Sequence, residues 1–134
     1  MKWRHVPVLM LGGLARGGRS RMVYEMKKLI SEYAAAVREI YGEHLKQIIL
    51  YGSYARGDYT KDSDIDIMLL VDLDEAEQDG FADALSELDF EYNMKYGIWM
   101  MPIVKNKKSF LQWSDICQFY KNIKEEGISL YEIA

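Results

Sequence analysis

The sequence predicts an α/β (α+β) fold in which a small mixed β-sheet is flanked by helices. Segments with apolar residues at three- and four-residue spacing, typical of amphipathic helices, alternate with short β-branched apolar runs, typical of buried strands. Glycines stand where several of these segments end. The length of 134 residues suits one domain, and 49% hydrophobic with 28% charged residues is an ordinary globular balance.

The first half of the chain gives one helix and two strands. A helix is expected over residues 23–41, followed by Gly42 in the usual position for a glycine that ends a helix. The short apolar run at 47–51 predicts a buried strand, and 64–71 predicts a second. The apolar face of the helix is formed by Met26, Leu29, Ile30, Tyr33, Val37, Ile40 and Tyr41.

The second half continues the alternation. A helix over about 74–94 opens in an acidic stretch, and a third strand is expected at 98–104. One or two helices over 107–126 end at Gly127, before a short extended piece at 128–131. This order predicts one mixed sheet with the helices on one side of it. The second helix has four apolar residues at helical spacing: Phe81, Leu85, Leu88 and Tyr92.

Residues 1–21 differ from the rest of the chain. They hold five basic residues and no acidic one, so a net charge of −4 for the whole chain leaves −9 for residues 22–134. Two Gly-Gly pairs interrupt any helix in this segment. We expect 1–21 to be a non-domain N-terminal extension, 22–134 to be the domain, and translation to begin at Met22 or Met26. Three arginines directly after the apolar stretch argue against the alternative, a signal peptide.

Charge and cysteine content exclude several classes of protein. An acidic domain repels the phosphate backbone, so we expect no general nucleic-acid binding, whereas a divalent cation or a basic partner protein is favoured. The single cysteine, Cys117, excludes an intramolecular disulfide framework and a cysteine-rich zinc site. No apolar run approaches the length of a membrane span, so we expect no membrane contact and a cytoplasmic location.

The stretch that carries chemistry lies around the first two strands. Gly52 and Ser53 stand where a strand ends and a helical turn can begin, so the backbone N–H groups and the Ser53 hydroxyl can hold phosphate oxygens. Arg56, one turn further, offers a charge-assisted contact. Asp64 and Asp66 are two apart at the start of a strand, so both carboxylates project to one side. Such a pair favours Mg²⁺, which also ligates phosphates.

Each half of this pattern alone is more often a turn or a strand end, but together they are specific. Gly-Ser, a ten-residue spacer and Asp-x-Asp resemble the motif of the nucleotidyltransferase superfamily of DNA polymerase beta. Residues 50–57, 63–66 and the ending 119–128 resemble the minimal nucleotidyltransferase (MNT) proteins of bacteria and archaea, over about 23–132. The resemblance implies a nucleotidyltransferase fold and transfer of AMP from ATP.

The resemblance also implies roles and a partner. Gly52 and Ser53 would hold nucleotide phosphates, and Asp64 and Asp66 would be the catalytic carboxylates that ligate Mg²⁺. Many MNT proteins look like antitoxins that silence a HEPN-domain toxin by modifying it with AMP. A HEPN-domain toxin-like protein is therefore the implied partner, in a homo- or hetero-oligomer.

One departure keeps a second interpretation open. The superfamily usually has a third carboxylate on the strand that corresponds to 98–104, but residues 92–114 contain no Asp or Glu. Trp99 is our candidate for the vacant position, with Asp89 or Glu91 as less favoured substitutes. The alternative function is therefore a catalytically degenerate nucleotidyltransferase that acts as a non-enzymatic protein-binding module.

Overall fold

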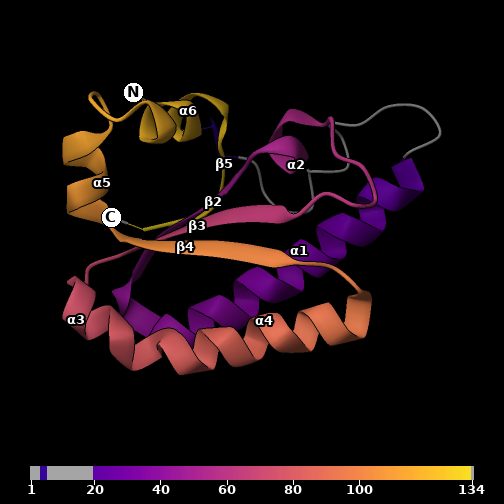
Figure 1. Ribbon diagram of the computed structural model, residues 1–134, viewed down its shortest axis with the longest axis horizontal. Helices are drawn as coiled ribbons and strands as arrows, with labels where there is room; N and C mark the ends of the chain where they lie inside the picture. The colour runs from indigo at the N-terminus through magenta and orange to yellow at the C-terminus, as the bar shows by residue number, and fades with distance from the viewer. Residues whose placement is uncertain (1–3, 6–19, 134) are drawn as a thin grey trace.

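A single mixed sheet organises the molecule. The computed structural model describes residues 4–5 and 20–133, and in these residues five strands pair in the order β1-β5-β2-β3-β4 (Figure 1). β2 is antiparallel to both β3 and β5, whereas β4 is parallel to β3 and β1 is parallel to β5. The predicted small mixed sheet is confirmed. The strands are β1 (Arg4–His5), β2 (Leu45–Tyr51), β3 (Ile65–Val71), β4 (Met100–Asn106) and β5 (Ile128–Glu132).

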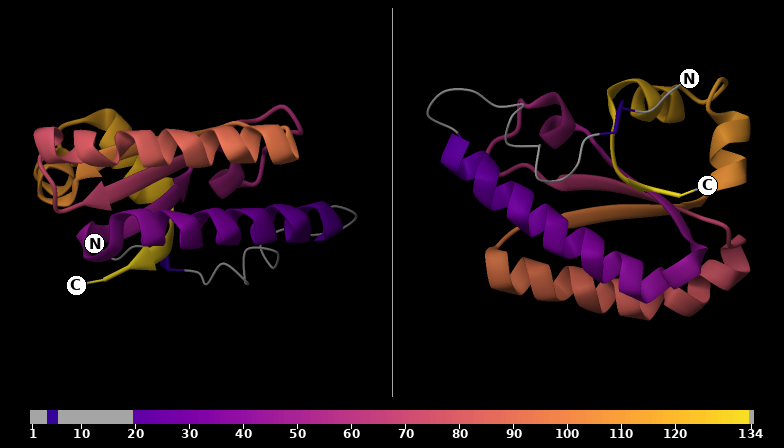
Figure 2. Two further views of the ribbon diagram at one scale, coloured as in Figure 1. Left: turned by 90° about the horizontal axis from the view of Figure 1, so that it is seen from below. Right: turned by 180° about the vertical axis from the view of Figure 1, so that it is seen from behind.

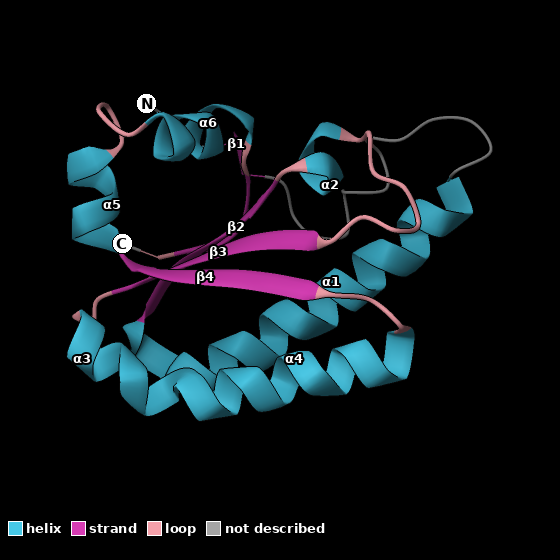
Figure 3. Ribbon diagram, viewed as in Figure 1, coloured by secondary structure: helices cyan, strands magenta, loops and turns pink. Residues whose placement is uncertain are grey.

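Helices cover both faces of this sheet. Figure 1 shows α1, α3 and α4 on one face and α5 and α6 on the other; Figure 3 shows the same layers by secondary structure. Figure 2 shows α1 and α4 running side by side. The expectation of helices on one side only is therefore wrong. The helices are α1 (Ser20–Tyr41), α2 (Ser53–Arg56), α3 (Glu75–Gln78), α4 (Ala82–Tyr96), α5 (Lys107–Trp113) and α6 (Gln118–Glu126), with 3₁₀ turns η3 (Gly42–His44) and η4 (Asp79–Phe81).

Two hydrophobic cores explain the second helical layer. Successive strand side chains point to opposite faces, so a strand that is apolar at nearly every position must be covered on both. Alternate residues of β3 from Ile65 to Val71 pack in the core under α1 and α4. Met68 and Leu70 point the other way and pack against Phe110 of α5 and Ile123 of α6.

Most predicted elements are present, with shifted ends. The single helix expected at 74–94 is divided by η4, which contains Gly80, a residue with low helix propensity. The strand expected at 98–104 begins at Met100, because Gly97 ends α4 with a φ of 66° and Asn93 Nδ2 donates to the Ile98 carbonyl at 3.0 Å. The expected extended piece at 128–131 forms β5.

The N-terminal segment lies mostly outside the described residues, so the expected extension and start site stay predictions. Arg4 and His5 form β1 and pair with Ile128 and Ser129 of β5, and the described chain resumes at Ser20, where α1 begins. No helix in the described part of the chain is long and apolar enough to cross a membrane.

A carboxylate between α1 and α4 makes stability depend on pH. Asp89 Oδ1 accepts a hydrogen bond of 2.6 Å from the Tyr33 hydroxyl, and burial raises the Asp89 pKa to about 6. A raised pKa means that the fold favours the protonated carboxyl. Its contribution to the free energy of unfolding is therefore complete below the unfolded pKa of about 4 and is lost as pH rises through 6.

We expect Asp89→Asn to stabilise the protein progressively, relative to wild type, as pH rises from 4 to 7. Asparagine keeps an acceptor for Tyr33 but has no charge to bury. Urea unfolding of both proteins at one-unit pH intervals measures the difference in free energy. A difference that does not change with pH would show that the Asp89 carboxylate is not destabilised by its position.

Candidate functional site

The site lies where β2 ends and β3 begins. In the antiparallel pair, Tyr51 is opposite Asp66, so the turn after Tyr51 starts directly beside this carboxylate. Asp66 alternates with Ile65 and Ile67, which are buried under α1 and α4, and it therefore projects to the face that carries α6. Strand pairing thus brings the two halves of the motif together.

Gly52 allows this close approach. It has a φ of 72° and a ψ of −153°, a conformation that is essentially restricted to glycine. A Cβ atom at this position would overlap Asp66 Oδ2 and would lie 3.2 Å from Asp66 Cγ. The glycine is therefore required both by the backbone and by the neighbouring carboxylate.

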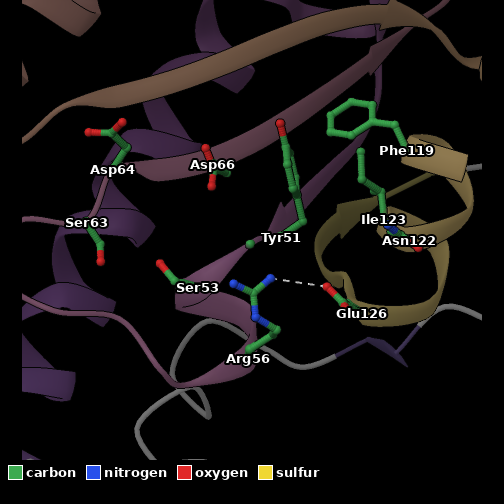
Figure 4. A pocket seen from close by; sticks show the side chains of 11 residues that line it. Tyr51, Ser53, Arg56, Ser63, Asp64, Asp66, Phe119, Asn122, Ile123 and Glu126 are labelled. Carbon is green, nitrogen blue, oxygen red and sulfur yellow. Dashed lines mark hydrogen bonds and ion pairs between the residues drawn. The ribbon is translucent and has the colours of Figure 1, made fainter.

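The turn that follows Gly52 can hold anionic oxygens. The N–H groups of Ala55 and Arg56 donate to the Gly52 carbonyl at 3.1 and 3.0 Å, so the hydrogen bonds of α2 begin at its third residue. The N–H groups of the first turn point outward from a helix start, where they suit an anion. The Ser53 side chain points into the same space (Figure 4).

The exposed carboxylate of Asp64 repels the partly buried carboxylate of Asp66. Burial raises the pKa of Asp66, and the charge of Asp64 raises it further, whereas Arg56 opposes the shift. Burial, together with the charge of Asp66, also raises the pKa of Tyr51 to about 12, so its phenol stays neutral. A divalent cation bound to both carboxylates would relieve their repulsion.

The donor set suits Mg²⁺. The described residues contain no group of three or more His, Cys, Asp and Glu side chains that could enclose a metal ion. Mg²⁺ is commonly bound by only one or two carboxylates, with substrate phosphates and water completing its shell. Asp64 and Asp66 beside an anion-binding turn fit that pattern.

A pocket of about 430 Å³ joins these groups, a volume within the usual range for a small-molecule site (Figure 4). It contains every site residue that the sequence predicted. Arg56 links α2 to the α6 side of the pocket, because its Nη1 lies 3.3 Å from Glu126 Oε2. Its Nε also lies 3.3 Å from Oδ2 of Asp58, which does not line the pocket. The lining residues are Tyr51, Gly52, Ser53, Arg56, Ser63, Asp64, Asp66, Phe119, Asn122, Ile123 and Glu126.

The sequence interpretation did not assign the far wall of this pocket. That wall is one face of α6, with Phe119, Asn122, Ile123 and Glu126. The Phe119 ring contacts the ring of Tyr51, the last residue of β2. Spacings of three, four and seven residues place these side chains on one side of a helix. This periodicity in the sequence indicated a helix face, but the sequence alone did not show that α6 packs beside the motif.

The position beside Asp66 on β4 is Met101. The parallel register pairs Asp66 with Met101, which is 45% exposed, whereas Trp99 precedes β4 and its carbonyl accepts a hydrogen bond from Ile65 N–H at 2.9 Å. Asp89 and Glu91, considered as substitutes for the missing carboxylate, belong to α4 on the opposite face of the sheet (Figure 1). They cannot reach the site.

A family model described as "Nucleotidyltransferase domain" matches residues 30–130. The chain is 39% identical over 108 residues to the "Putative protein adenylyltransferase MJ0604" of Methanocaldococcus jannaschii, which covers 78% of this chain and 97% of the relative. A second protein of that organism, "Putative protein adenylyltransferase MJ0141", is 33% identical over 87 residues, covering 62% and 82% respectively.

A solved structure shares the fold. One chain of a crystal structure described as a mutant of the toxin–antitoxin MntA-HpeT superposes with a TM-score of 0.50 at 18% identity. The match covers 77% of this chain and 73% of that chain.

We expect Gly52→Ala to lower the free energy of unfolding by more than Gly57→Ala. Backbone strain at either positive φ costs about 1–3 kcal/mol. An added methyl group at Gly57 meets nothing within 4 Å, whereas at Gly52 it displaces the Asp66 side chain. Urea unfolding measures both effects. Shortening the neighbour with Asp66→Ala should reduce the effect of Gly52→Ala; equal effects in the two backgrounds would contradict the close approach.

Proposed function

The chain belongs to the nucleotidyltransferase domain family, and on this premise we propose that it binds ATP with Mg²⁺ and transfers AMP to a partner protein. The observation that carries the proposal is the convergence of Gly52, Ser53, Asp64 and Asp66 in one pocket. The names of the two Methanocaldococcus jannaschii relatives support a protein as the acceptor of the AMP group.

Each residue of the motif has a role in this proposal. The backbone at Gly52 and the hydroxyl of Ser53 bind phosphate oxygens, and Arg56 contributes a positive charge after it leaves Glu126. Asp64 and Asp66 hold Mg²⁺, which supplies charge neutralisation for the phosphates. The reaction forms a bond between an acceptor oxygen and the α-phosphorus and breaks the bond to pyrophosphate. The chain's contribution is to fix the triphosphate for an in-line attack.

The partner in this proposal is a HEPN-domain toxin-like protein. The shared fold with a chain of a toxin–antitoxin complex supports a hetero-oligomer of that kind. The net charge of −9 over residues 22–134 favours a basic partner surface. We place both proteins in the cytoplasm, because the proposed reaction consumes ATP.

A second candidate function rests on the β4 side of the site. Met101 occupies the place on β4 where a third carboxylate would receive the proton of the attacking hydroxyl. A domain with two carboxylates can hold a metal–nucleotide complex and still transfer AMP slowly. The alternative is therefore a catalytically degenerate nucleotidyltransferase that binds and sequesters its partner.

Nucleotide binding should depend on the two carboxylates. Asp64→Asn with Asp66→Asn should weaken Mg²⁺-dependent ATP binding at least about tenfold (about 1.4 kcal/mol), because neutral amides replace the anionic oxygen ligands that Mg²⁺ prefers. The fold should stay intact or become slightly more stable, because the repulsion is relieved. Calorimetric titration with and without Mg²⁺ measures the affinity. Asp62→Asn, an exposed neighbour outside the pocket, is the matched control. Equal affinities for all three proteins would refute the nucleotide site.

A carboxylate introduced at Met101 separates the two candidate functions. Met101→Asp should raise the rate of AMP transfer, because a general base typically contributes about 10²–10⁴-fold. Met101→Asn is the control for the change in shape. The assay follows label from α-³²P-ATP onto a co-expressed HEPN-domain partner. Fast transfer by the wild type, unchanged in Met101→Asp and abolished without Asp64 and Asp66, would show that no third carboxylate is needed.

A further inference from the structure

The α6 wall of the pocket has a chemistry unlike that of the phosphate end. The phosphate end holds two carboxylates, an arginine and two serines. At the α6 end, Phe119, Ile123 and Tyr51 add aromatic and aliphatic groups beside the polar Asn122 and the Glu126 carboxylate that pairs with Arg56. A nucleotide has the same two halves, a polyanion and a flat apolar base. The pocket therefore fits a nucleotide in one orientation, with the phosphates at the carboxylate end and the base at the α6 end.

Phe119 and Tyr51 bring two aromatic rings together at the α6 end of the pocket. Phe119 lines the pocket and is 44% exposed as a residue, although its ring also contacts Tyr51, with ring centroids 5.9 Å apart and planes at 84°. Two nearly perpendicular rings form an apolar corner (Figure 4). Such a corner suits a flat ring that stacks on Phe119 and meets the second ring edge-on.

Asn122 adds one polar group beside that corner. Its Oδ1 accepts a hydrogen bond from Gln118 Nε2 at 2.8 Å, so the oxygen is engaged along the helix surface. The amide therefore offers its N–H donors to a ligand in the pocket, which Asn122 also lines. A donor at this place recognises an acceptor, such as an unprotonated ring nitrogen of a purine or a ribose oxygen.

We propose that α6 is the nucleoside-recognition element of this protein: a purine base stacks on Phe119, and Asn122 donates a hydrogen bond to an acceptor of the nucleoside. The inference rests on the proposed nucleotide site and adds the residues that distinguish a nucleotide from a bare triphosphate. Base–aromatic stacking contributes about 1–3 kcal/mol per base, which corresponds to about 5- to 150-fold in affinity.

The experiment compares two ligands on the full chain. Calorimetry in Mg²⁺ measures the affinity for ATP and for inorganic triphosphate, which shares the phosphates and has no base. We expect the wild type to bind ATP at least about tenfold more tightly than triphosphate. Phe119→Ala should remove most of that advantage and leave triphosphate affinity unchanged, and Asn122→Ala should weaken ATP binding by about 2- to 10-fold.

Two further variants guard against a purely structural effect. Phe119→Leu keeps apolar bulk against Tyr51 and lacks a flat ring, so it should preserve the melting temperature and still lose ATP affinity. Phe90→Ala, on the outer side of α4 with 67% of the phenylalanine exposed, should change neither affinity. A CTP and UTP series should show weaker binding than ATP and GTP, since pyrimidines stack over a smaller area.

Different results would overturn base recognition by α6 and the nucleotide site itself. A wild type that binds ATP, with an affinity that Phe119→Ala and Asn122→Ala leave unchanged, would overturn the α6 assignment and leave the nucleotide site standing. The same holds if Phe119→Ala weakens ATP and triphosphate equally. A wild type that binds neither ligand in Mg²⁺ would overturn the proposed function itself.

Discussion

The antiparallel register of β2 on β3 is the constraint on which the site depends. Because Tyr51 is opposite Asp66, the chain leaves β2 directly beside the carboxylate, and only glycine fits at the next position. A slip of one residue would move every side chain of β3 to the other face. The two cores prevent that slip, since Ile67 belongs to one and Met68 to the other. Hydrophobic burial on both faces of the sheet therefore holds two repelling carboxylates on the surface of the pocket.

The elements could be predicted from the sequence because their patterns are local. The apolar face of α1 and the apolar run of β3 can each be recognised from a few neighbouring residues. The order of elements along the chain follows from such segments. The consecutive apolar residues of β3 also indicated that both faces of the sheet are covered. They did not show which helices cover each face. Buried polar pairs such as Gln47 and Ser129, joined at 3.2 Å across β2 and β5, have no local signal at all.

In the candidate site, too, local residues could be predicted and distant ones could not. Gly52, Ser53, Asp64 and Asp66 could be found because the motif is contiguous in sequence and its spacing is specific. Phe119 and Glu126 could not, because they reach the pocket from a helix more than fifty residues away along the chain. The assignment of Trp99 to the vacant position differed from the observed register by two residues, since Gly97 delays the start of β4. Strand ends are set by such turns, which periodicity does not locate.

One physical picture connects these features. A pair of carboxylates, an anion-binding turn and an apolar aromatic corner line one pocket, and they match the three parts of a metal–nucleotide complex: metal, phosphates and base. The most direct test is a crystal structure of the protein grown with Mn²⁺ and a non-hydrolysable ATP analogue, with anomalous scattering to locate the metal. The account predicts an anomalous peak between Asp64 and Asp66, with phosphates at Ser53. A nucleotide bound elsewhere, or a metal that touches neither aspartate, would contradict it.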